Sequence, residues 1–402
     1  MKRHLIGIGG VGMSALATAL VRLGDEVTGA DRTLGTPNVR FLESLGVKVF
    51  PDDGSGVDAA TGEVVVSTAI ESDNPGLVRA AELGIPVVHR AKALAHALSG
   101  HRLVAVVGTC GKSTVTAMLG HVLAECGLDP FCVNGANVPG WEGAVRFGRG
   151  EYAVAEVDES DRSLVAFSPY AAIVTNASAD HYSKEEMDQV FDDFARNCPG
   201  PVVDGRKCDP GEAETTMPGR HNRQNAALAL RMAVALGVDE AKARAALLTF
   251  RGVERRLQRV GGNVFDDYAH NPEKLRAMWT TLAEEYPGGL CAVWRPHGYA
   301  PLRKMLDALV EMFTSTIRPQ DRLLVLPVYD AGGTADRSIN SDALVAQLGD
   351  KAVAVSDFDE AYSWCRARRG DFAAFAVCGA RDPGLAPFAR RLASLKVEKL
   401  KG

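Results

Sequence analysis

The chain has 402 residues, of which 46% are hydrophobic and 24% charged, and its formal net charge is −5. This length predicts two or three domains of an ordinary globular enzyme, and the lack of a basic surplus argues against nucleic acid as a partner. No apolar run approaches the roughly 18 residues of a membrane-spanning helix, so no membrane association is expected. The eight cysteines contain no C-x-x-C pair, which favours reduced thiols in a cytoplasm over a zinc site or a disulfide frame.

Short apolar strands alternate with helical segments through the first hundred residues. The first predicted strand, 4–8, runs into the turn G-I-G-G-V-G at 7–12, and Asp31 follows nineteen residues after the last of these glycines. This spacing is typical of a dinucleotide-binding turn, and the alternation predicts a parallel sheet. The other predicted strands are 26–30, 47–50, 63–67 and 86–88, and the helices are 13–23, 38–45, 76–83 and 91–98.

A second α/β unit begins with the apolar run 103–107, which leads into G-T-C-G-K-S-T at 108–114. Such a loop presents backbone N–H groups, the Lys112 cation and a helix N-terminus to a polyphosphate. The Ser113 hydroxyl is placed to hold Mg²⁺. Val106 stands where a full Walker A motif has its first glycine, so an ordinary strand–turn–helix corner is the alternative interpretation.

Polar residues follow the next two predicted strands, 152–157 and 171–176. Glu156 begins an acidic segment, and His181 comes shortly after the second strand. The carboxyl ends of parallel strands meet at one ligand-binding edge, where a hydroxyl, a carboxylate and an imidazole could hold Mg²⁺. The alternative is a solvated acidic loop. Helices are predicted at 184–194 and at 224–236, where this unit would end at Gly237, with a polar loop at 204–217.

A third α/β unit begins near Phe250. Its predicted strands are 264–267, 290–294, 322–328 and 374–378, with a helix at 301–313. The sequence therefore predicts three domains, 1–100, 101–249 and 250–402.

Ordered motifs along nearly the whole chain resemble the Mur ligases, ATP-dependent amide-forming enzymes of peptidoglycan precursor synthesis, and above all their alanine-adding members. The motifs are H-L-I-G-I-G-G-V-G-M-S at 4–14, the loop at 108–114, T-N at 175–176 with D-H at 180–181, P-G-R-H-N at 218–222, D-D-Y-A-H-N-P at 266–272 and P-H-x-Y at 296–299. The resemblance implies a Rossmann-like N-terminal domain for a UDP-sugar, a P-loop-type central ATPase domain and a Rossmann-like C-terminal domain that closes over the amino acid.

The resemblance also implies the chemistry. A substrate carboxylate attacks the γ-phosphate of ATP, and the amine of an amino acid then attacks the acyl phosphate. Catalytic roles fall on Lys112, His181, Arg256 and His270. The ATP-binding residues are Gly108, Thr109, Gly111, Lys112, Ser113, Thr114, Asn222, Asn225, Arg256 and Asp267. The Mg²⁺ ligands are Ser113, Glu156 and His181, and the residues for UDP-sugar and amino acid are Gly9, Gly10, Gly12, Asp31, Ser67, Thr68, His270 and His297.

Several of these residues have a plainer interpretation. Asn222 and Asn225 also suit a helix cap followed by a surface amide, Arg256 a surface charge, and His270 a helix-start histidine. The glycine turn at 7–12 would also fit an NAD-dependent reductase, but that interpretation does not explain the phosphate loop at 108–114.

The chain departs from the alanine-adding pattern in three places. Cys110 replaces a histidine, several dozen residues are missing between 182 and 217, and the segment after His297 lacks two arginines, for which Arg295 and Arg303 are the nearest replacements. L-Alanine is therefore a default amine. The alternatives are a related ligase that adds another amino acid or peptide, or a non-catalytic nucleotide-binding homologue. We expect a cytoplasmic monomer or weak homodimer.

Overall fold

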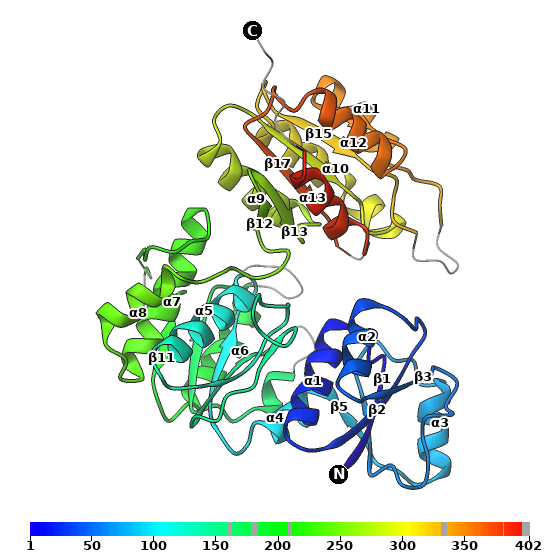
Figure 1. Ribbon diagram of the computed structural model, residues 1–402, viewed down its shortest axis with the longest axis vertical. Helices are drawn as coiled ribbons and strands as arrows, with labels where there is room; N and C mark the ends of the chain where they lie inside the picture. Colours follow the sequence, from blue (N-terminus) through cyan, green and yellow to red (C-terminus); the bar gives the residue numbers. More distant parts are fainter. Residues whose placement is uncertain are drawn as a thin grey trace. The chain divides into compact units, whose positions relative to one another are not determined.

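The computed structural model describes residues 1–158, 163–177, 184–207, 209, 211–330, 336–380 and 382–395. The chain divides into two compact units, Met1–Thr216 with His221–Val253 and Met217–Arg220 with Glu254–Gly402. The described residues form three sheets, two in the first unit and one in the second (Figure 1). This parallel-rich α/β architecture confirms the predicted fold class. The three domain boundaries stay a prediction, because the division into units joins the first two sheets.

The first sheet is parallel, in the order β3-β2-β1-β4-β5. Its strands are β1 (Lys2–Ile6), β2 (Glu26–Asp31), β3 (Lys48–Pro51), β4 (Glu63–Val66) and β5 (Val87–His89). Its helices are α1 (Val11–Arg22), α2 (Pro37–Ser44), α3 (Pro75–Glu82) and α4 (Arg90–Ala97). The predicted first strand ends early, at Ile6, because the next two N–H groups both donate to the Ala30 carbonyl and turn the chain.

The second sheet has the order β11-β10-β6-β9-β7-β8, and β8 is its one antiparallel strand among the described residues. Its strands are β6 (Arg102–Val107), β7 (Phe131–Val133), β8 (Val145–Arg146), β9 (Tyr152–Glu156), β10 (Ala171–Val174) and β11 (Val202–Asp204). The helical segments are α5 (Lys112–Glu125), η1 (Ser163–Ala166), α6 (Lys184–Arg196), α7 (Arg220–Ala235) and α8 (Glu240–Leu247). The prediction that this unit ends at Gly237 was wrong, since α8 follows and packs against α5.

One hydrophobic cluster joins the first two sheets into a single unit. Ala15 and Ala19 of α1 belong to the same buried cluster as Ala105 of β6. Alanine side chains let a helix approach closely, which brings more apolar surface out of water. Arg22 and Glu142 add a bidentate ion pair across this junction, with Nε–Oε2 and Nη2–Oε1 distances of 2.6 and 2.5 Å.

The third sheet has the order β12-β13-β17-β14-β15-β16, with β12 antiparallel. Its strands are β12 (Gln258–Gly261), β13 (Val264–Asp267), β14 (Leu290–Trp294), β15 (Arg322–Val325), β16 (Ala352–Ala354) and β17 (Ala374–Cys378). The helical segments are α9 (Pro272–Glu285), α10 (Tyr299–Thr316), α11 (Asp342–Leu348), η2 (Gly349–Lys351), α12 (Phe358–Ala367) and α13 (Leu385–Ala393).

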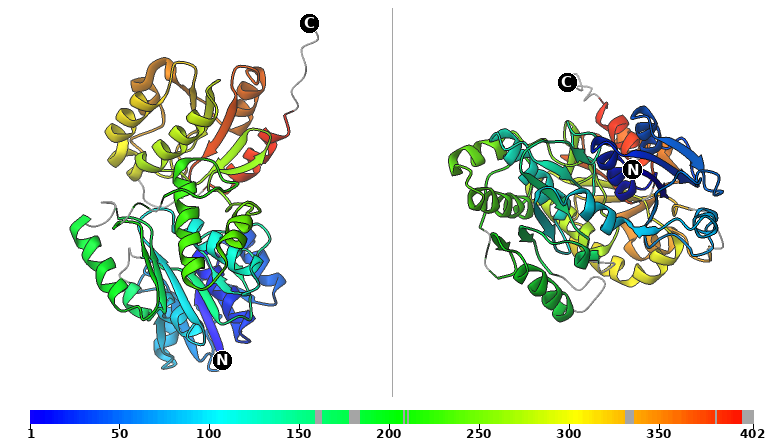
Figure 2. Two further views of the ribbon diagram at one scale, coloured as in Figure 1. Left: turned by 90° about the vertical axis from the view of Figure 1, so that its left-hand side faces the viewer. Right: turned by 90° about the horizontal axis from the view of Figure 1, so that it is seen from below.

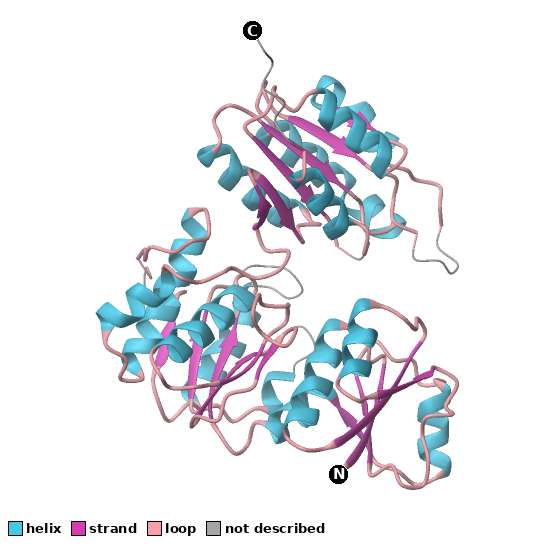
Figure 3. Ribbon diagram, viewed as in Figure 1, coloured by secondary structure: helices cyan, strands magenta, loops and turns pink. Residues whose placement is uncertain are grey.

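Helices cover both faces of the third sheet (Figures 2 and 3). Residues of α9, α10 and α11 form one buried cluster with Ala292 and Trp294 of β14, whereas α12 and α13 share a second cluster with Cys291 and Val293. Alternate residues of β14 therefore face opposite layers, as expected for a strand buried on both faces. This arrangement leaves the strand ends as the accessible edge.

Candidate functional site

The loop between β6 and α5 has the geometry of a phosphate-binding loop. Gly111 caps the N-terminus of α5, so Lys112 and Ser113 begin the helix as predicted. Ser113 and Thr114 are buried at this end, and the Lys112 Nζ donates to the Gly108 carbonyl at 2.7 Å. The first N–H groups of α5 and the positive end of its helix dipole therefore face the loop.

Asn176, which follows β10, holds this loop in shape. Its Oδ1 accepts hydrogen bonds from the Thr109 hydroxyl at 2.6 Å and the Cys110 N–H at 2.9 Å, and its Nδ2 donates to the Cys110 carbonyl at 3.0 Å. The Thr175 hydroxyl donates to the same carbonyl at 2.7 Å. The pair T-N at 175–176 thus acts as a buttress for the loop, a role that the sequence interpretation did not give it.

Two positions of the loop accept only glycine. Gly108 has φ +127°, and a Cβ there would lie 2.1 Å from the Thr175 Oγ1. Gly111 has φ +83°, and its Cβ would lie 2.7 Å from the Asn225 Oδ1. Because glycine has no Cβ and tolerates a positive φ, the loop backbone can lie close to Thr175 and Asn225 and can also approach a ligand closely.

Asn222 and Asn225 of α7 are buried, with exposed fractions of 2% and 8%. The plainer interpretation of Asn225 as a surface amide is therefore wrong, because its side chain lies against Gly111 of the phosphate loop. The Asn225 Nδ2 lies 3.4 Å from the Asn222 Oδ1. Helix α7 thus lies beside the phosphate loop, although the helix and the loop are about a hundred residues apart in the chain.

Glu156 ends β9 next to the phosphate-loop strand β6. Its Oε2 accepts a hydrogen bond from the Gly135 N–H at 2.8 Å. With Ser113 it supplies the hydroxyl and carboxylate oxygens that Mg²⁺ prefers, so this donor chemistry fits the ion. The third predicted ligand, His181, lies outside the described residues, and the described ones contain no cluster of three or more His, Cys, Asp or Glu side chains suited to a metal.

The glycine turn after β1 is closed by Asp31 at the end of β2. The Gly9 N–H donates to the Asp31 Oδ2 at 2.8 Å, and the Asn38 Nδ2 donates to the Gly9 carbonyl at 2.8 Å. Gly10 caps α1 without help from a side chain. Ser67 and Thr68 follow β4, the neighbour of β1, at the same strand-end edge, and Thr68 is exposed.

Arg90, the first residue of α4, lies between this turn and the second sheet. Its Nη1 is 3.3 Å from the position that a Cβ on Gly12 would take, and its Nη2 is 3.4 Å from the Asp158 Oδ2. Asp158 follows Glu156 by two residues. The guanidinium therefore connects the predicted UDP-sugar turn with the predicted magnesium side of the ATP site.

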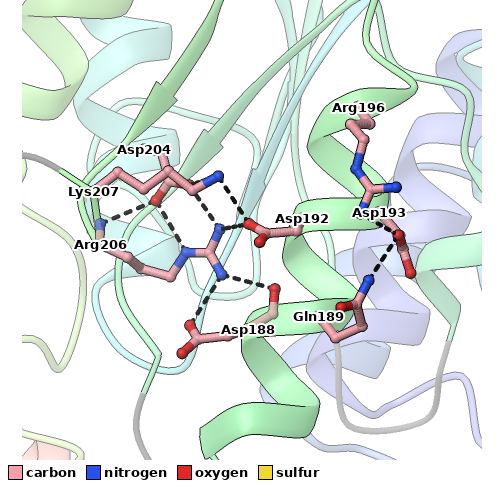
Figure 4. Close-up of polar contacts among 8 residues, drawn as sticks. All are labelled: Asp188, Gln189, Asp192, Asp193, Arg196, Asp204, Arg206 and Lys207. Atoms are coloured by element: carbon pink, nitrogen blue, oxygen red, sulfur yellow. Dashed lines mark hydrogen bonds and ion pairs between the residues drawn. The ribbon is translucent and has the colours of Figure 1, made fainter.

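A cavity of about 390 Å³ lies beside Asn176, near the edge of the second sheet that β11 forms, and most of its lining residues are charged. Figure 4 shows the Arg206 guanidinium enclosed by Asp188 and Asp192 of α6 and by Asp204 of β11, at 3.0, 2.7 and 2.6 Å. Arg206 is only 8% exposed, and these hydrogen bonds raise its pKa. The Lys207 ammonium adds a contact to Asp192 at 3.0 Å and helps to lower the pKa of that carboxyl.

The acidic side chains of this cavity are thus neutralised by its own cations. We call Asp188, Asp192, Asp204, Arg206 and Lys207 the Arg206 clamp. It joins α6 to β11 in the part of the chain where residues are missing relative to the alanine-adding pattern. A structural role follows more directly from these contacts than ligand binding does.

In the second unit, a row of rings follows the carboxyl ends of β13 and β14. The ring centroids of Tyr268 and His270 are 5.4 Å apart, and those of His270 and His297 are 4.9 Å apart. The Arg256 guanidinium lies 5.1 Å from the Tyr268 ring centre. The structure thus brings together Arg256, His270 and His297, three of the predicted site residues.

His270 is held as a neutral imidazole. Its Nδ1 lies 2.9 Å from the Tyr268 carbonyl oxygen, which has no proton, so Nδ1 carries the hydrogen. Burial lowers the pKa of His270 to about 4. Its Nε2 therefore has a lone pair at neutral pH.

Two backbone N–H groups hold the Asp267 carboxylate. Its Oδ2 accepts from the Leu257 N–H at 2.6 Å and its Oδ1 from the Ala269 N–H at 2.7 Å, and burial raises its pKa. The side chain thus fixes the loop that carries Arg256. Asp266, the preceding residue, pairs with Arg255 at 3.3 Å.

Neither nearby replacement for the missing arginines is poised for a substrate. Arg295 donates to the Asp382 Oδ2 at 2.6 Å and to the Pro327 carbonyl at 3.0 Å. Arg303 pairs with Asp336 at 2.9 Å and donates to the Ser338 hydroxyl. These contacts turn both guanidinium groups toward the protein's own acceptors.

Two family models match the chain. One, described as "Mur ligase family, catalytic domain", covers residues 2–102, and the other, "Mur ligase, glutamate ligase domain", covers residues 255–381. The chain therefore belongs to the Mur ligase family, and as a member it is an ATP-dependent ligase. No helix among the described residues is long and apolar enough to cross a membrane.

Individual relatives narrow the comparison. A UDP-N-acetylmuramate–L-alanine ligase from Paenarthrobacter aurescens is 35% identical, with 89% of this chain and 94% of the relative covered. One from Rhizobium meliloti is 33% identical, with 86% of each covered. The solved UDP-N-acetylmuramate-alanine ligase of Thermotoga maritima superposes with a TM-score of 0.79 at 26% identity over 98% of both chains. A murein peptide ligase from Psychrobacter arcticus, at 19% identity, 98% and 99% coverage and a TM-score of 0.66, shares the fold.

The first of these alignments spans 436 positions, more than the 402 residues of this chain. The relative therefore contains residues that this chain lacks. This agrees with the shortening inferred from the sequence.

Proposed function

We propose that this protein joins L-alanine to the carboxylate of a UDP-N-acetylmuramate substrate at the expense of ATP, in peptidoglycan precursor synthesis. The observation that carries the proposal is the phosphate loop buttressed by Asn176 and Asn225, in a chain 35% identical to a ligase of that name. We further propose a cytoplasmic enzyme.

Each site residue has a role in this proposal. Lys112 and the N–H groups at the start of α5 bind the β- and γ-phosphates of ATP. Ser113 and Glu156, with His181, are the residues that would hold Mg²⁺, which neutralises phosphate charge when bound. Arg256 meets the transferred phosphoryl group, because a guanidinium binds phosphate oxygens in a bidentate manner. Asn222, Asn225 and Asp267 serve the nucleoside side.

The glycine turn binds the UDP-sugar. Gly9, Gly10 and Gly12 present the N-terminus of α1 to its pyrophosphate, with Asp31, Ser67 and Thr68 on the uridine side. His270 and His297 receive the amino acid. The neutral Nε2 of His270 can accept a hydrogen bond from the incoming amine, which must lose a proton to form the amide.

The test is phosphate release from ATP with Mg²⁺ and UDP-N-acetylmuramate across a panel of amino acids, with mass spectrometry of the product. We expect release that needs both the sugar nucleotide and L-alanine. Release with another amino acid instead would favour the related-ligase alternative. Nucleotide binding without release for any amino acid would favour a non-catalytic homologue.

A phosphate-loop variant makes this test specific. Lys112→Ala should lower kcat by about 10²–10³-fold, as loss of one preorganised cation at the transferred phosphate does. The control is Arg244→Ala, whose exposed side chain pairs with Glu240 on α8. Equal rates for Lys112→Ala and the unmodified protein would contradict the assignment of the loop.

A further inference from the structure

A second cavity of about 390 Å³ lies within the first unit, at the C-terminal end of α5. The phosphate loop is at the other end of this helix, and His121 in the cavity wall follows Lys112 by nine residues, about 13 Å along a helix axis. The cavity is therefore separate from the candidate ATP site. Its lining includes the rings of His121, Trp141 and Phe250 and the charged groups of Glu125, Arg146 and Arg251.

Trp141 is held in place by a tight turn and by a glycine of α5. The Trp141 N–H donates to the Val138 carbonyl at 3.0 Å, and Gly140 has φ +91°, as expected for a type II turn with the sequence V-P-G-W. On α5, a Cβ on Gly120 would lie 2.7 Å from the Cys132 Sγ and 3.1 Å from the Trp141 Cζ2. Glycine is unfavourable inside a helix, and here it lets the indole approach the backbone. The half-buried indole is thus fixed before any ligand binds.

His121 provides a second ring and a hydrogen-bond acceptor. Its Nε2 lies 3.0 Å from the Ala246 carbonyl oxygen and 2.9 Å from the Thr249 Oγ1, and its ring centroid is 5.6 Å from that of Phe250. Because a carbonyl oxygen has no proton, Nε2 carries the hydrogen and Nδ1 has a lone pair. Burial lowers the pKa of His121, so the ring is neutral at pH 7.

Arg251 is the exposed cation of this cavity. No described residue forms a hydrogen bond or an ion pair with its guanidinium. Arg146, in contrast, donates to the Pro130 carbonyl at 2.7 Å and pairs with Asp129 at 2.8 Å. The lining contains these two guanidinium groups and one carboxylate, that of Glu125, so its net charge is positive. A guanidinium binds the oxygens of a phosphate or a carboxylate in a bidentate manner.

We propose that this cavity is a second ligand site, for a small aromatic molecule that carries a phosphate or a carboxylate group. The ring of the ligand lies on Trp141, and its anionic group binds Arg251. The Nδ1 of His121 and the Glu125 carboxylate accept hydrogen bonds from N–H or O–H groups on the ring. The volume lies within the range of about 300–1,000 Å³ that is usual for small-molecule sites. This site does not depend on the proposed ligase activity.

The test compares two fluorescent probes with the same rings. Anilinonaphthalene sulfonate has an anionic group, and phenylnaphthylamine lacks it. Binding is titrated on the full chain with saturating ADP, Mg²⁺ and UDP-N-acetylmuramate, which occupy the candidate active site. Arg251→Ala should raise the Kd of the sulfonate about tenfold and leave the Kd of phenylnaphthylamine unchanged, and Arg251→Lys should recover part of the loss. Trp141→Ala should raise both Kd values about tenfold, because both probes lose their stacking partner.

Two matched controls are Arg244→Ala and Trp364→Ala. Arg244 is an exposed arginine of the same unit and pairs with Glu240 on α8. Trp364 is also a half-buried tryptophan near an arginine, since the Arg368 guanidinium lies 4.5 Å from its ring centre. Neither substitution should change the Kd of either probe.

Displacement of the bound sulfonate distinguishes the two kinds of ligand. Displacement by AMP would support a phosphate ligand, and displacement by indoleacetate would support a carboxylate ligand. The proposal is overturned if neither compound displaces the probe, if Arg251→Ala weakens both probes equally, or if neither Arg251→Ala nor Trp141→Ala changes binding of the sulfonate. Because Arg251 is exposed, its variant gives a result even if Trp141→Ala does not fold. Each of these outcomes leaves the proposed function standing.

Discussion

The edge of the second sheet and the edge of the third sheet are built from different interactions. At the second sheet, amides, carboxylates and one enclosed guanidinium hold the phosphate loop and α6 in place. At the third sheet, the rings of Tyr268, His270 and His297 contact one another in a row, with the Arg256 guanidinium beside Tyr268. Hydrogen bonds and ion pairs fix one geometry, whereas ring contacts tolerate small displacements.

This difference suits two kinds of ligand. A polyphosphate is recognised by its charge and shape, so a preformed cradle with fixed N–H donors binds it well. An amino acid is small, and its recognition depends on a few side chains that differ among ligases. We therefore expect substitutions at the second sheet to damage stability and phosphate chemistry together, and substitutions at the third sheet to change amine binding and pH response.

The largest expected effect comes from removing the centre of the Arg206 clamp. Arg206→Ala leaves three carboxylates close together, one of them Asp204 with a side chain only 9% exposed, and should lower the free energy of unfolding by about 3–5 kcal/mol. Chemical denaturation measures it. Arg196→Ala is the control on the same helix: its pair with Asp193 is 69% and 55% exposed, so its loss should cost under about 0.5 kcal/mol. Similar losses of unfolding free energy in the two variants would show that the Arg206 clamp stabilises the protein no more than an exposed ion pair does.

Acid should weaken the same clamp. Lys207 and Arg206 lower the pKa of Asp192, so its contribution to stability is complete above the ordinary pKa of an aspartate and is lost as pH falls through the lowered value. The difference in unfolding free energy between Arg206→Ala and the unmodified protein should therefore shrink in strong acid.

A methyl group in the phosphate loop should have the next largest effect. Gly108→Ala places a Cβ 2.1 Å from the Thr175 Oγ1 at φ +127° and should cost about 2–4 kcal/mol of stability. At Gly127 φ is also positive, +84°, but nothing lies within 4 Å of an added Cβ, so about 1 kcal/mol is expected for Gly127→Ala. Equal losses of stability in the two variants would mean that Gly108 is required for its backbone conformation alone, and not for the close approach of Thr175.

At the third sheet we expect a pH effect. The pKa of His270 is about 4 in the folded protein and 6.5 in the unfolded chain, so the unfolded state binds the extra proton between these values. Its contribution to stability is present above pH 6.5 and is lost as pH falls toward 4. His270→Gln should therefore flatten the fall of unfolding free energy across this window, as measured by denaturation at several pH values. An unchanged slope would mean that His270 is not held neutral.

The smallest effect is expected at Cys110. Its backbone N–H and carbonyl bond to Asn176 and Thr175, and these contacts do not depend on the thiol. Cys110→Ser should keep kcat/KM within about twofold. A loss of more than tenfold would indicate that the sulfur itself takes part in phosphate binding.

The sequence by itself determined the α/β class, the parallel alternation, the phosphate loop and the family. Strands 264–267, 290–294 and 374–378 were predicted with the observed bounds. In the last two, a continuous apolar run between polar turns marks a strand buried on both faces. Glycine spacing next to such a run predicted two phosphate-binding turns. These signals are local, so one chain segment contains them completely.

Only the tertiary structure decided which distant side chains meet. The short edge strands β8 and β11 leave no periodic pattern, and the burial of Asn225 against Gly111 joins residues more than a hundred positions apart. The Arg206 clamp joins α6 and β11, and the rings of His270 and His297, which follow different strands, lie 4.9 Å apart. An arginine looks like any surface charge in a sequence. Its partners become visible when parallel strands bring their carboxyl ends to one edge.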